Sequence, residues 1–314
     1  MKRWMHVLIV IVMIAGLFGG CTAGGGAPEA SGTPVPKDIL SENVDAMGNE
    51  VTASAIPEEQ LTIVSTAPSA TEILFALGCG DSIVGVDVWS TYPEQTADIE
   101  KVGDFNGFDV EKVIALNPSV VFAGNGLQHE DIAALENAGL NVVSVEATYY
   151  DDIAKSITMI GGVVGKEAEA EALIKQIADA ETAVKEKAAA ITEKPSVYYV
   201  MGIGEYGNWT SGEGSYINSV IDLTGGVPTT AGTASEWLEY PVEDLVKNDP
   251  DILIVSSNVT EADLLAETGY KDLTAVKEGH YYLITSDIIE RPGPRIIEAL
   301  QTIQGDIEAF LAGE

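Results

Sequence analysis

Two stretches of this 314-residue chain place aromatic rings and a glutamate at matching spacing, 132 residues apart. In each stretch one aromatic residue lies six positions before the glutamate, a second lies three before it, and a proline follows seven after it. The first copy comprises Phe105, Phe108, Glu111 and Pro118, and the second comprises Trp237, Tyr240, Glu243 and Pro250. A repeat this long that occurs only twice predicts two similar lobes rather than a solenoid. Rings on two facing lobes would hold a ligand as a clamp does, so the chemistry predicted is binding.

The tryptophans extend this candidate clamp. Apart from Trp4 near the N-terminus, the chain contains Trp89, Trp209 and Trp237, and Phe105 is the first-lobe counterpart of Trp237. The three tryptophans are expected in loops after strands or before helices. Ligands of open α/β sheets bind beyond the carboxyl ends of the strands, where flat rings can contact a large, partly apolar molecule. We predict that all four rings contact one ligand, against the alternative that each packs beneath its own loop.

Catalysis and direct metal binding have little support. The chain lacks a G-x-S-x-G, a Walker or an H-E-x-x-H motif. Beyond the N-terminal segment the histidines are His129 and His280, too few for a site that holds a bare metal ion. His280 is expected to be structural, and His129 is either a solvated residue at a helix start or a donor to a metal inside a bound chelate. We predict no catalytic residue, no metal held by the protein and no cofactor of its own.

Arginine is scarce, with Arg3, Arg291 and Arg295 only. Strongly anionic ligands are normally bound by several arginines, so one or two fit a neutral or weakly charged ligand better. Arg291 is the predicted ligand contact, and Arg295 is expected in a structural ion pair.

The N-terminus predicts export and lipidation. Lys2 and Arg3 precede an apolar run over residues 7–18, and Cys21 directly follows two glycines. A charged start, a short apolar run and small residues are typical of a signal peptide, here residues 1–20. Cys21 is the predicted lipidation site, with an uncleaved anchor or a soluble secreted form as alternatives. Acylation would tether the chain to the outer face of the cell membrane. A periplasmic location is the alternative.

The charge balance restricts the partners. There are 49 acidic residues against 16 basic ones, a net charge of −33. Nucleic acid is excluded as a partner because phosphate binding needs basic patches, and an anionic lipid surface would repel the chain. Either a cationic protein partner or a high-salt habitat explains the excess.

Alternating strands and helices predict an α/β fold with mainly parallel sheets. Residues 21–60 read as a flexible tether with a small hairpin over 44–51, followed by an N-terminal lobe over 61–165 and a C-terminal lobe over 194–314. Ser69 and Glu72 are expected to form a capping box. Between the lobes, residues 166–193 have the apolar spacing of one long helix without Gly or Pro. A stiff bridging helix predicts small hinge motions.

Four stretches carry a family resemblance: residues 63–78 (IVSTAPSATEILFALG), Tyr92–Pro93, residues 110–118 (VEKVIALNP), and residues 286–295, which end in ERPGPR. Together they resemble the periplasmic-binding-protein family that delivers corrinoids, ferric siderophores and haem to ABC importers. The resemblance covers roughly residues 43–312, and it identifies the family far better than the ligand. It implies two α/β lobes, a single bridging helix and a ligand cleft between the lobes.

The resemblance also implies roles for individual residues. Glu111 and Glu243 match the acids that dock on arginines of the permease dimer, one in each lobe. The four predicted clamp rings match positions where the cobalamin-binding member lines its cleft with aromatics. Gly124 stands where that member has a further Trp, which weakens vitamin B12 itself and leaves room for another corrinoid or a ferric chelate.

The chain is therefore expected to be a monomeric, lipid-anchored receptor and not an enzyme. It would capture a metal-chelate ligand carrying cobalt or iron and deliver it to an ABC permease dimer with its ATPase subunits. A corrinoid is preferred, a ferric siderophore is the second choice and haem the third. A hydrolase or a metal-cluster assembly protein of similar architecture is the alternative from a different class.

Overall fold

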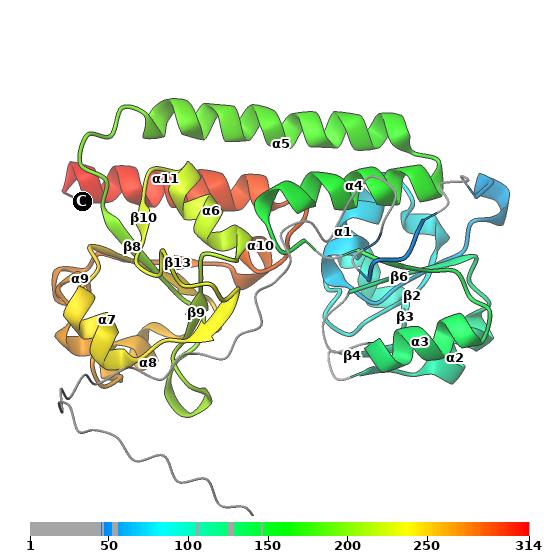
Figure 1. Ribbon diagram of the computed structural model, residues 1–314, viewed down its shortest axis with the longest axis horizontal. Helices are drawn as coiled ribbons and strands as arrows, with labels where there is room; N and C mark the ends of the chain where they lie inside the picture. The colour runs from blue at the N-terminus through cyan, green and yellow to red at the C-terminus, as the bar shows by residue number, and fades with distance from the viewer. Residues whose placement is uncertain are drawn as a thin grey trace, which may run out of the picture. The chain divides into compact units, whose positions relative to one another are not determined.

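The computed structural model describes residues 45, 47–51, 56–104, 107–124, 129–145 and 147–313, which form two α/β lobes (Figure 1). The sheet of the first lobe has five parallel strands in the order β3-β2-β1-β6-β7. These strands are β1 (Ile63–Ser65), β2 (Ile83–Val86), β3 (Glu100–Lys101), β6 (Val120–Ala123) and β7 (Val142–Ser144). A short antiparallel pair, β4 (Gly103–Asp104) and β5 (Gly107–Phe108), lies beside it.

The second lobe has a four-stranded parallel sheet in the order β10-β8-β12-β13. Its strands are β8 (Ser196–Val200), β10 (Val227–Pro228), β12 (Ile252–Ser256) and β13 (Tyr281–Ile284). A separate antiparallel ribbon joins β9 (Trp209–Ser211) to β11 (Trp237–Glu239). The predicted fold class, two lobes with mainly parallel sheets, is confirmed.

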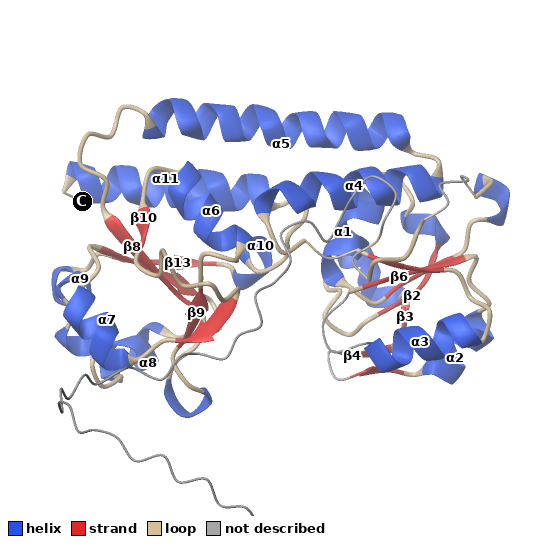
Figure 2. Ribbon diagram, in the orientation of Figure 1, coloured by secondary structure: helices blue, strands red, loops and turns tan. Residues whose placement is uncertain are grey.

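Helices cover both faces of these sheets (Figure 2). They are α1 (Pro68–Ala76), α2 (Val110–Leu116), α3 (His129–Asn137), α4 (Tyr150–Val164), α5 (Glu167–Ala188), α6 (Tyr216–Leu223), α7 (Val242–Asn248), α8 (Glu261–Ala266), α9 (Thr274–Glu278), α10 (Ser286–Ile289) and α11 (Ile296–Ala312). In β12, Ile252 and Ile254 join one hydrophobic cluster while Leu253 and Val255 join another. Both faces of the strand are therefore buried, which explains its unbroken apolar sequence.

The bridging helix is α5, which has 22 residues and so extends for about 33 Å. It packs on α4 of the first lobe and on α11 of the second (Figure 1). Leu173, Ile177 and Val184 of the predicted apolar stripe are buried in a hydrophobic cluster that also contains residues of both sheets. One continuous core therefore connects the two lobes.

The described part of the repeated sequence unit forms the same helix end twice. Helices α2 and α7 each have seven residues. Each ends at a residue with left-handed backbone, Asn117 (φ 49°) or Asp249 (φ 42°), and these are the two positions other than glycine with positive φ among the described residues. A buried proline follows in each case, Pro118 or Pro250. The two units thus share their helix ends and their approach to the next strand.

The N-terminal predictions fall mostly outside the described residues, since these begin at Asp45 and include neither the signal peptide nor Cys21. The expected hairpin over 44–51 stays a prediction, because residues 44 and 46 lie outside the described ones. Within this stretch the Gly48 amide donates to the Asp45 carbonyl at 3.0 Å. The Asp45 carboxylate also accepts from the Ser144 amide at 3.1 Å, which attaches this segment to the end of β7. Within the described ranges, none of the helices combines the length and the apolar composition needed to cross a membrane.

Candidate functional site

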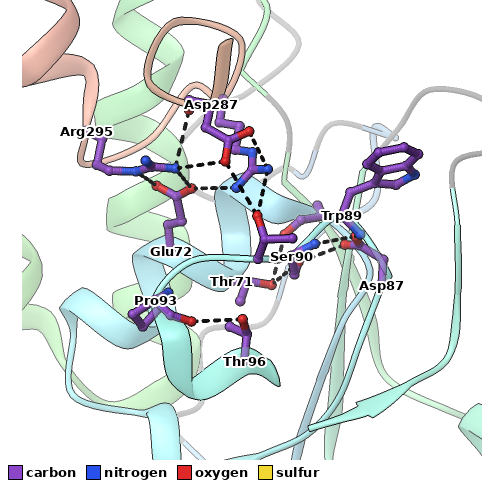
Figure 3. A network of polar contacts seen from close by, with 12 residues as sticks. Thr71, Glu72, Asp87, Trp89, Ser90, Pro93, Thr96, Asp287 and Arg295 are labelled. Carbon is purple, nitrogen blue, oxygen red and sulfur yellow. Dashed lines mark hydrogen bonds and ion pairs between the residues drawn. The ribbon is translucent and has the colours of Figure 1, made fainter. Parts of the chain in front are cut away.

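A tight turn after β2 presents Trp89 to solvent. Asp87 is 2% exposed, and its carboxylate accepts hydrogen bonds from the Trp89 amide at 2.6 Å, the Ser90 amide at 2.8 Å and the Ser90 hydroxyl at 2.9 Å. Burial raises the pKa of Asp87, while these hydrogen bonds act in the opposite direction. The Trp89 indole itself is 53% exposed, and Figure 3 shows it projecting away from the polar network.

This turn is fixed to the first lobe by hydroxyl groups. The Ser90 hydroxyl lies 2.9 Å from the Thr71 hydroxyl of α1. The Thr71 hydroxyl is in turn 2.8 Å from the hydroxyl of Ser65 at the end of β1. All three side chains are buried, so the turn has little freedom relative to the sheet.

The next residues of the same turn reach the second lobe. Arg291 donates from Nη2 to the Thr91 hydroxyl at 3.2 Å. The guanidinium of Arg295 lies 4.2 Å from the centroid of the Tyr92 ring, within the range of a cation–π contact. The turn that carries Trp89 therefore touches both lobes.

Glu72 of α1 is the centre of the contact between the lobes (Figure 3). Its side chain is 2% exposed, and it accepts from Arg295 Nε at 2.9 Å, from Arg295 Nη2 at 2.6 Å and from Arg291 Nη1 at 3.2 Å. Arg291 also pairs with Asp287 at 2.6 Å. Two arginines thus face two carboxylates, and the charges balance.

Two of the predictions made from the sequence concern residues of this network. The expected capping box of Ser69 and Glu72 is wrong, because α1 begins at Pro68 with Ala67 as its N-cap and without a side-chain cap. Glu72 is instead directed at the second lobe. Arg295 forms the structural ion pair expected of it, and Arg291 is paired as well. Contact between Arg291 and a ligand remains a prediction.

The second lobe carries Trp209 and Trp237 on the β9–β11 ribbon, so their prediction as loop residues is wrong. Trp209 pairs with Glu239, and Trp237 pairs with Ser211. Because side chains alternate along a strand, both indoles lie on the same face of the ribbon. Trp209 is 39% exposed. Trp237 is half-buried and stands edge-on to Tyr216, with the ring centroids 6.4 Å apart.

The turn that carries Trp89 and the ribbon that carries Trp209 both follow the carboxyl ends of parallel strands. Trp89 comes three residues after the last residue of β2, and the amide of Met201, directly after β8, donates to the Trp209 carbonyl at 3.1 Å. This is the location expected for ligand contacts in such sheets. Phe105 lies outside the described residues, and Gly124 directly follows β6. That the rings share one ligand remains a prediction.

Two cavities lie elsewhere. One of about 470 Å³ borders the ribbon and α7 and is lined by Asn208, Glu239, Glu243 and Glu267, among others. The second, of about 420 Å³, lies between the start of α4, the second half of α6 and the bridging helix α5. Trp89, Trp209 and Trp237 line neither of them.

The two predicted docking glutamates occupy equivalent exposed positions. Glu111 is the second residue of α2 and Glu243 is the second residue of α7. Val113 and Leu245, two positions after the glutamates, have no exposure and pack into the cores of their lobes. The same face, with its glutamate, is thus offered by each lobe.

Sequence reasoning assigned no role to Glu290. Its carboxylate accepts from the hydroxyls of Tyr199 at 2.6 Å and Ser256 at 2.9 Å, and from the Asn258 amide group at 3.2 Å. Burial raises the pKa of the Tyr199 hydroxyl, and the nearby carboxylate adds to this. The contacts lie at the carboxyl ends of β8 and β12, on the strands that precede the ribbon and α8. The only indication in the sequence that Glu290 has such a role is its position as the first residue of the ERPGPR motif.

The histidines differ in their surroundings. His129 begins α3 and is exposed. His280 packs edge-on against Phe310, with ring centroids 4.9 Å apart, as expected of a structural residue. Across the described ranges, no group of three or more His, Cys, Asp or Glu side chains is arranged to hold a metal ion.

Two α/β lobes joined by one long helix, with exposed indoles beyond the strand ends, define a substrate-binding protein. The chain belongs to the periplasmic binding protein family, whose model matches residues 63–288. This is a family of binding proteins and not of enzymes, so the predicted family and the non-enzymatic class are confirmed.

Individual relatives agree with this placement. An ABC transporter substrate-binding lipoprotein of Bacillus subtilis, YvrC, is 31% identical over 311 residues, covering 97% of this chain and 96% of the relative. A vitamin B12-binding protein of Vibrio parahaemolyticus is 28% identical over 239 residues, covering 76% and 86%. The structure of the periplasmic haem-binding protein RhuT from Roseiflexus has a TM-score of 0.73 and 25% identity, and the match covers 81% of this chain and all of that one. The chain is similar to each of them.

Proposed function

We propose that this chain is the lipid-anchored receptor of an ABC importer for a metal-chelate ligand, with a corrinoid as the preferred ligand. Trp89 and Trp209 carry the proposal, because each is a large exposed ring beyond the carboxyl end of a parallel sheet, one in each lobe. Exposed indoles cost solvation free energy unless a ligand or partner covers them. Phe105 and Trp237 complete the proposed set of ligand-binding rings.

The charges favour a ligand without strong negative charge. Arg291 and Arg295 are the arginines of the described residues, and Glu72 and Asp287 already neutralise them. A ligand with several carboxylates would have to compete with these two acids for the guanidinium groups. A corrinoid presents a broad macrocycle edged with neutral amides, which suits aromatic contact and places little demand on arginine.

Haem, the third choice from the sequence after a ferric siderophore, gains support because a haem-binding protein is among the similar solved structures. Its two propionates would require cations at the site, and Arg291 is the one cation in the predicted set of ligand-binding residues. A ferric siderophore stands between the two in its demand for charge. His129 would be the donor to test if the bound metal has an open axial position.

Delivery would proceed through Glu111 and Glu243. Both are exposed, lie on equivalent helices and belong to a chain with a net charge of −33. A permease dimer that presents one basic site on each subunit would match the two glutamates, and its ATPase subunits would drive release into the pore. Acylation of Cys21 would keep the receptor at the outer face of the membrane, close to this partner.

Titration of the purified protein with cyanocobalamin, a ferric hydroxamate and haem tests the ligand class. Tryptophan fluorescence follows each addition. The proposal predicts saturable one-to-one binding of the corrinoid with the highest affinity and no turnover. Tighter binding of haem or of the ferric hydroxamate would select the corresponding alternative, and consumption of any of the three would contradict a receptor.

A further inference from the structure

Two exposed aliphatic side chains occupy matching places on the docking helices. Ile114 of α2 is 42% exposed and Val246 of α7 is 38% exposed. They are 132 residues apart, the same offset that separates Glu111 from Glu243. Each follows its glutamate by three positions, which places the acid and the aliphatic group side by side on the helix surface.

The equivalence is structural as well as sequential. Val113 and Leu245, the residues just before these aliphatics, have no exposure and fix how each helix is rotated on its lobe. Asn117 and Asp249 then end the two helices in the same left-handed conformation. The face that carries the glutamate and the aliphatic residue is therefore presented in the same way twice. Both helices lie on the side of their sheets away from α5 (Figure 1).

We infer that Ile114 and Val246 form the apolar half of the contact with the permease, each beside its glutamate. This inference rests on the proposed docking role of Glu111 and Glu243. The partner would offer, at two equivalent places, an apolar patch next to a basic side chain. A second copy of this chain is a poor occupant, because its own net charge of −33 would repel the first. An anionic lipid surface is a poor occupant for the same reason.

Physical chemistry gives the aliphatic residues a distinct task. An ion pair at an exposed surface contributes little, and it is screened by salt. A chain this acidic that relied on glutamates alone would lose its partner in high salt. Apolar contact is not screened, and it is strongest at the centre of an interface from which water is excluded. Each aliphatic group would therefore stabilise the complex at salt concentrations that weaken the ion pair.

The test is binding of the full chain to its permease with ATPase subunits, prepared from the organism that encodes this chain and reconstituted in nanodiscs. The apolar variant is Ile114→Ser with Val246→Ser, and the acidic variant is Glu111→Gln with Glu243→Gln. Leu311→Ser is the matched control, since Leu311 is 46% exposed but lies at the end of α11. Dissociation constants are measured at about 0.1 M and 1 M NaCl, where the screening lengths are about 10 Å and 3 Å.

The apolar variant should weaken permease binding by about tenfold or more at both salt concentrations. The acidic variant should weaken it clearly at low salt and much less at high salt, and the control should bind normally. Affinity for the small ligand should be unchanged in all three. If serine lowers thermal stability, Ile114→Thr and Val246→Thr replace it with smaller changes in shape.

The two hypotheses fail in different ways. Loss of binding in the acidic variant with normal binding in the apolar variant at both salt concentrations would overturn the inference and leave the docking role of the glutamates intact. Normal binding in both variants would overturn the docking role itself. A loss in the apolar variant that disappears at high salt would also contradict the inference, because apolar contact does not weaken in salt.

Discussion

Arg295 and Glu72 meet across the two lobes through two parallel hydrogen bonds, from Nε to Oε2 at 2.9 Å and from Nη2 to Oε1 at 2.6 Å. Such a fork-to-fork pair fixes direction as well as distance. It lies next to Tyr92, in the same turn that presents Trp89. The contact between the lobes and the proposed ligand site are therefore connected by one short segment of chain.

Removing Glu72 should destabilise the protein strongly. In a Glu72→Ala variant the largely buried guanidinium of Arg295 would lose its main acceptor and Arg291 would keep only Asp287. Breaking a buried pair on one side costs about 3–5 kcal/mol. Unfolding in urea, followed by far-UV circular dichroism, measures the loss. Glu171→Gln, on the exposed side of α5, is the control and should stay within about 0.5 kcal/mol of the wild type. A wild-type midpoint for Glu72→Ala would contradict the central position of this residue.

The sequence was sufficient to predict the architecture, because each lobe depends on local patterns. Alternating strands and helices, and an uninterrupted apolar stripe such as Leu173 to Val184, are visible within short windows. The contact between Glu72 and Arg295 was not, since it joins residues 223 positions apart. A local rule assigned Glu72 to a capping box, and the tertiary contact overrode it.

Trp209 and Trp237 should respond differently to truncation. Trp209→Ala removes an exposed ring and should lower ligand affinity by about 1–3 kcal/mol with little effect on folding. Trp237→Ala removes a ring packed on Tyr216, so it should lower both ligand affinity and the free energy of unfolding. Calorimetric titration and urea unfolding of both variants separate the effects. Unchanged affinity in both would remove the aromatic clamp.

Asp87 should position Trp89. Asp87→Ala removes the acceptor of three hydrogen bonds that shape the turn, and should weaken ligand binding about as much as Trp89→Ala. Asp87→Asn retains a carbonyl oxygen for the two amide donors and should restore most of the affinity. If alanine and asparagine weaken binding equally, the acceptor geometry is not what matters.

Asp306 should make stability depend on pH. Burial raises the pKa of Asp306 to about 6, so the folded state binds a proton that the unfolded state has already released. Its contribution is therefore most favourable below about pH 4 and declines as the pH rises toward 7. Asp306→Asn should remove this decline and stabilise the protein at pH 8 by about 1 kcal/mol, a value discounted for partial exposure. The difference in urea midpoint between variant and wild type, measured from pH 4 to 8, should grow with pH; a constant difference would contradict the shift.

Charge reversal should separate binding from delivery. A Glu111→Arg, Glu243→Arg variant should bind its small ligand normally, because both side chains are exposed on helices that carry none of the proposed ligand-binding rings. Uptake should be abolished, since two cations would then face a cationic partner. Cells that express the variant in place of the wild type, fed labelled cyanocobalamin, provide the measurement. Normal uptake would show that delivery uses another surface.

The candidate site was only partly accessible from sequence. The duplicated unit predicted equivalent positions for Glu111 and Glu243. Its spacing corresponds to the same helix and the same turn in both lobes. The setting of Trp209 and Trp237 was missed, since a two-stranded ribbon of three-residue strands has too few residues to show alternation. The contact between Thr71 and Ser90 was missed because it joins two segments 19 positions apart, and the Asp87 turn was missed although its hydrogen bonds are local.

The central claim, that one ligand is held by rings of both lobes, is tested most directly with two single-tryptophan proteins, in which the other indoles beyond Trp4 are replaced by phenylalanine. One keeps Trp89 and the other keeps Trp209, and each is titrated with cyanocobalamin while indole fluorescence is recorded. The account predicts quenching of both proteins with the same midpoint and one-to-one stoichiometry. Quenching of only one of them, or of neither, would contradict it.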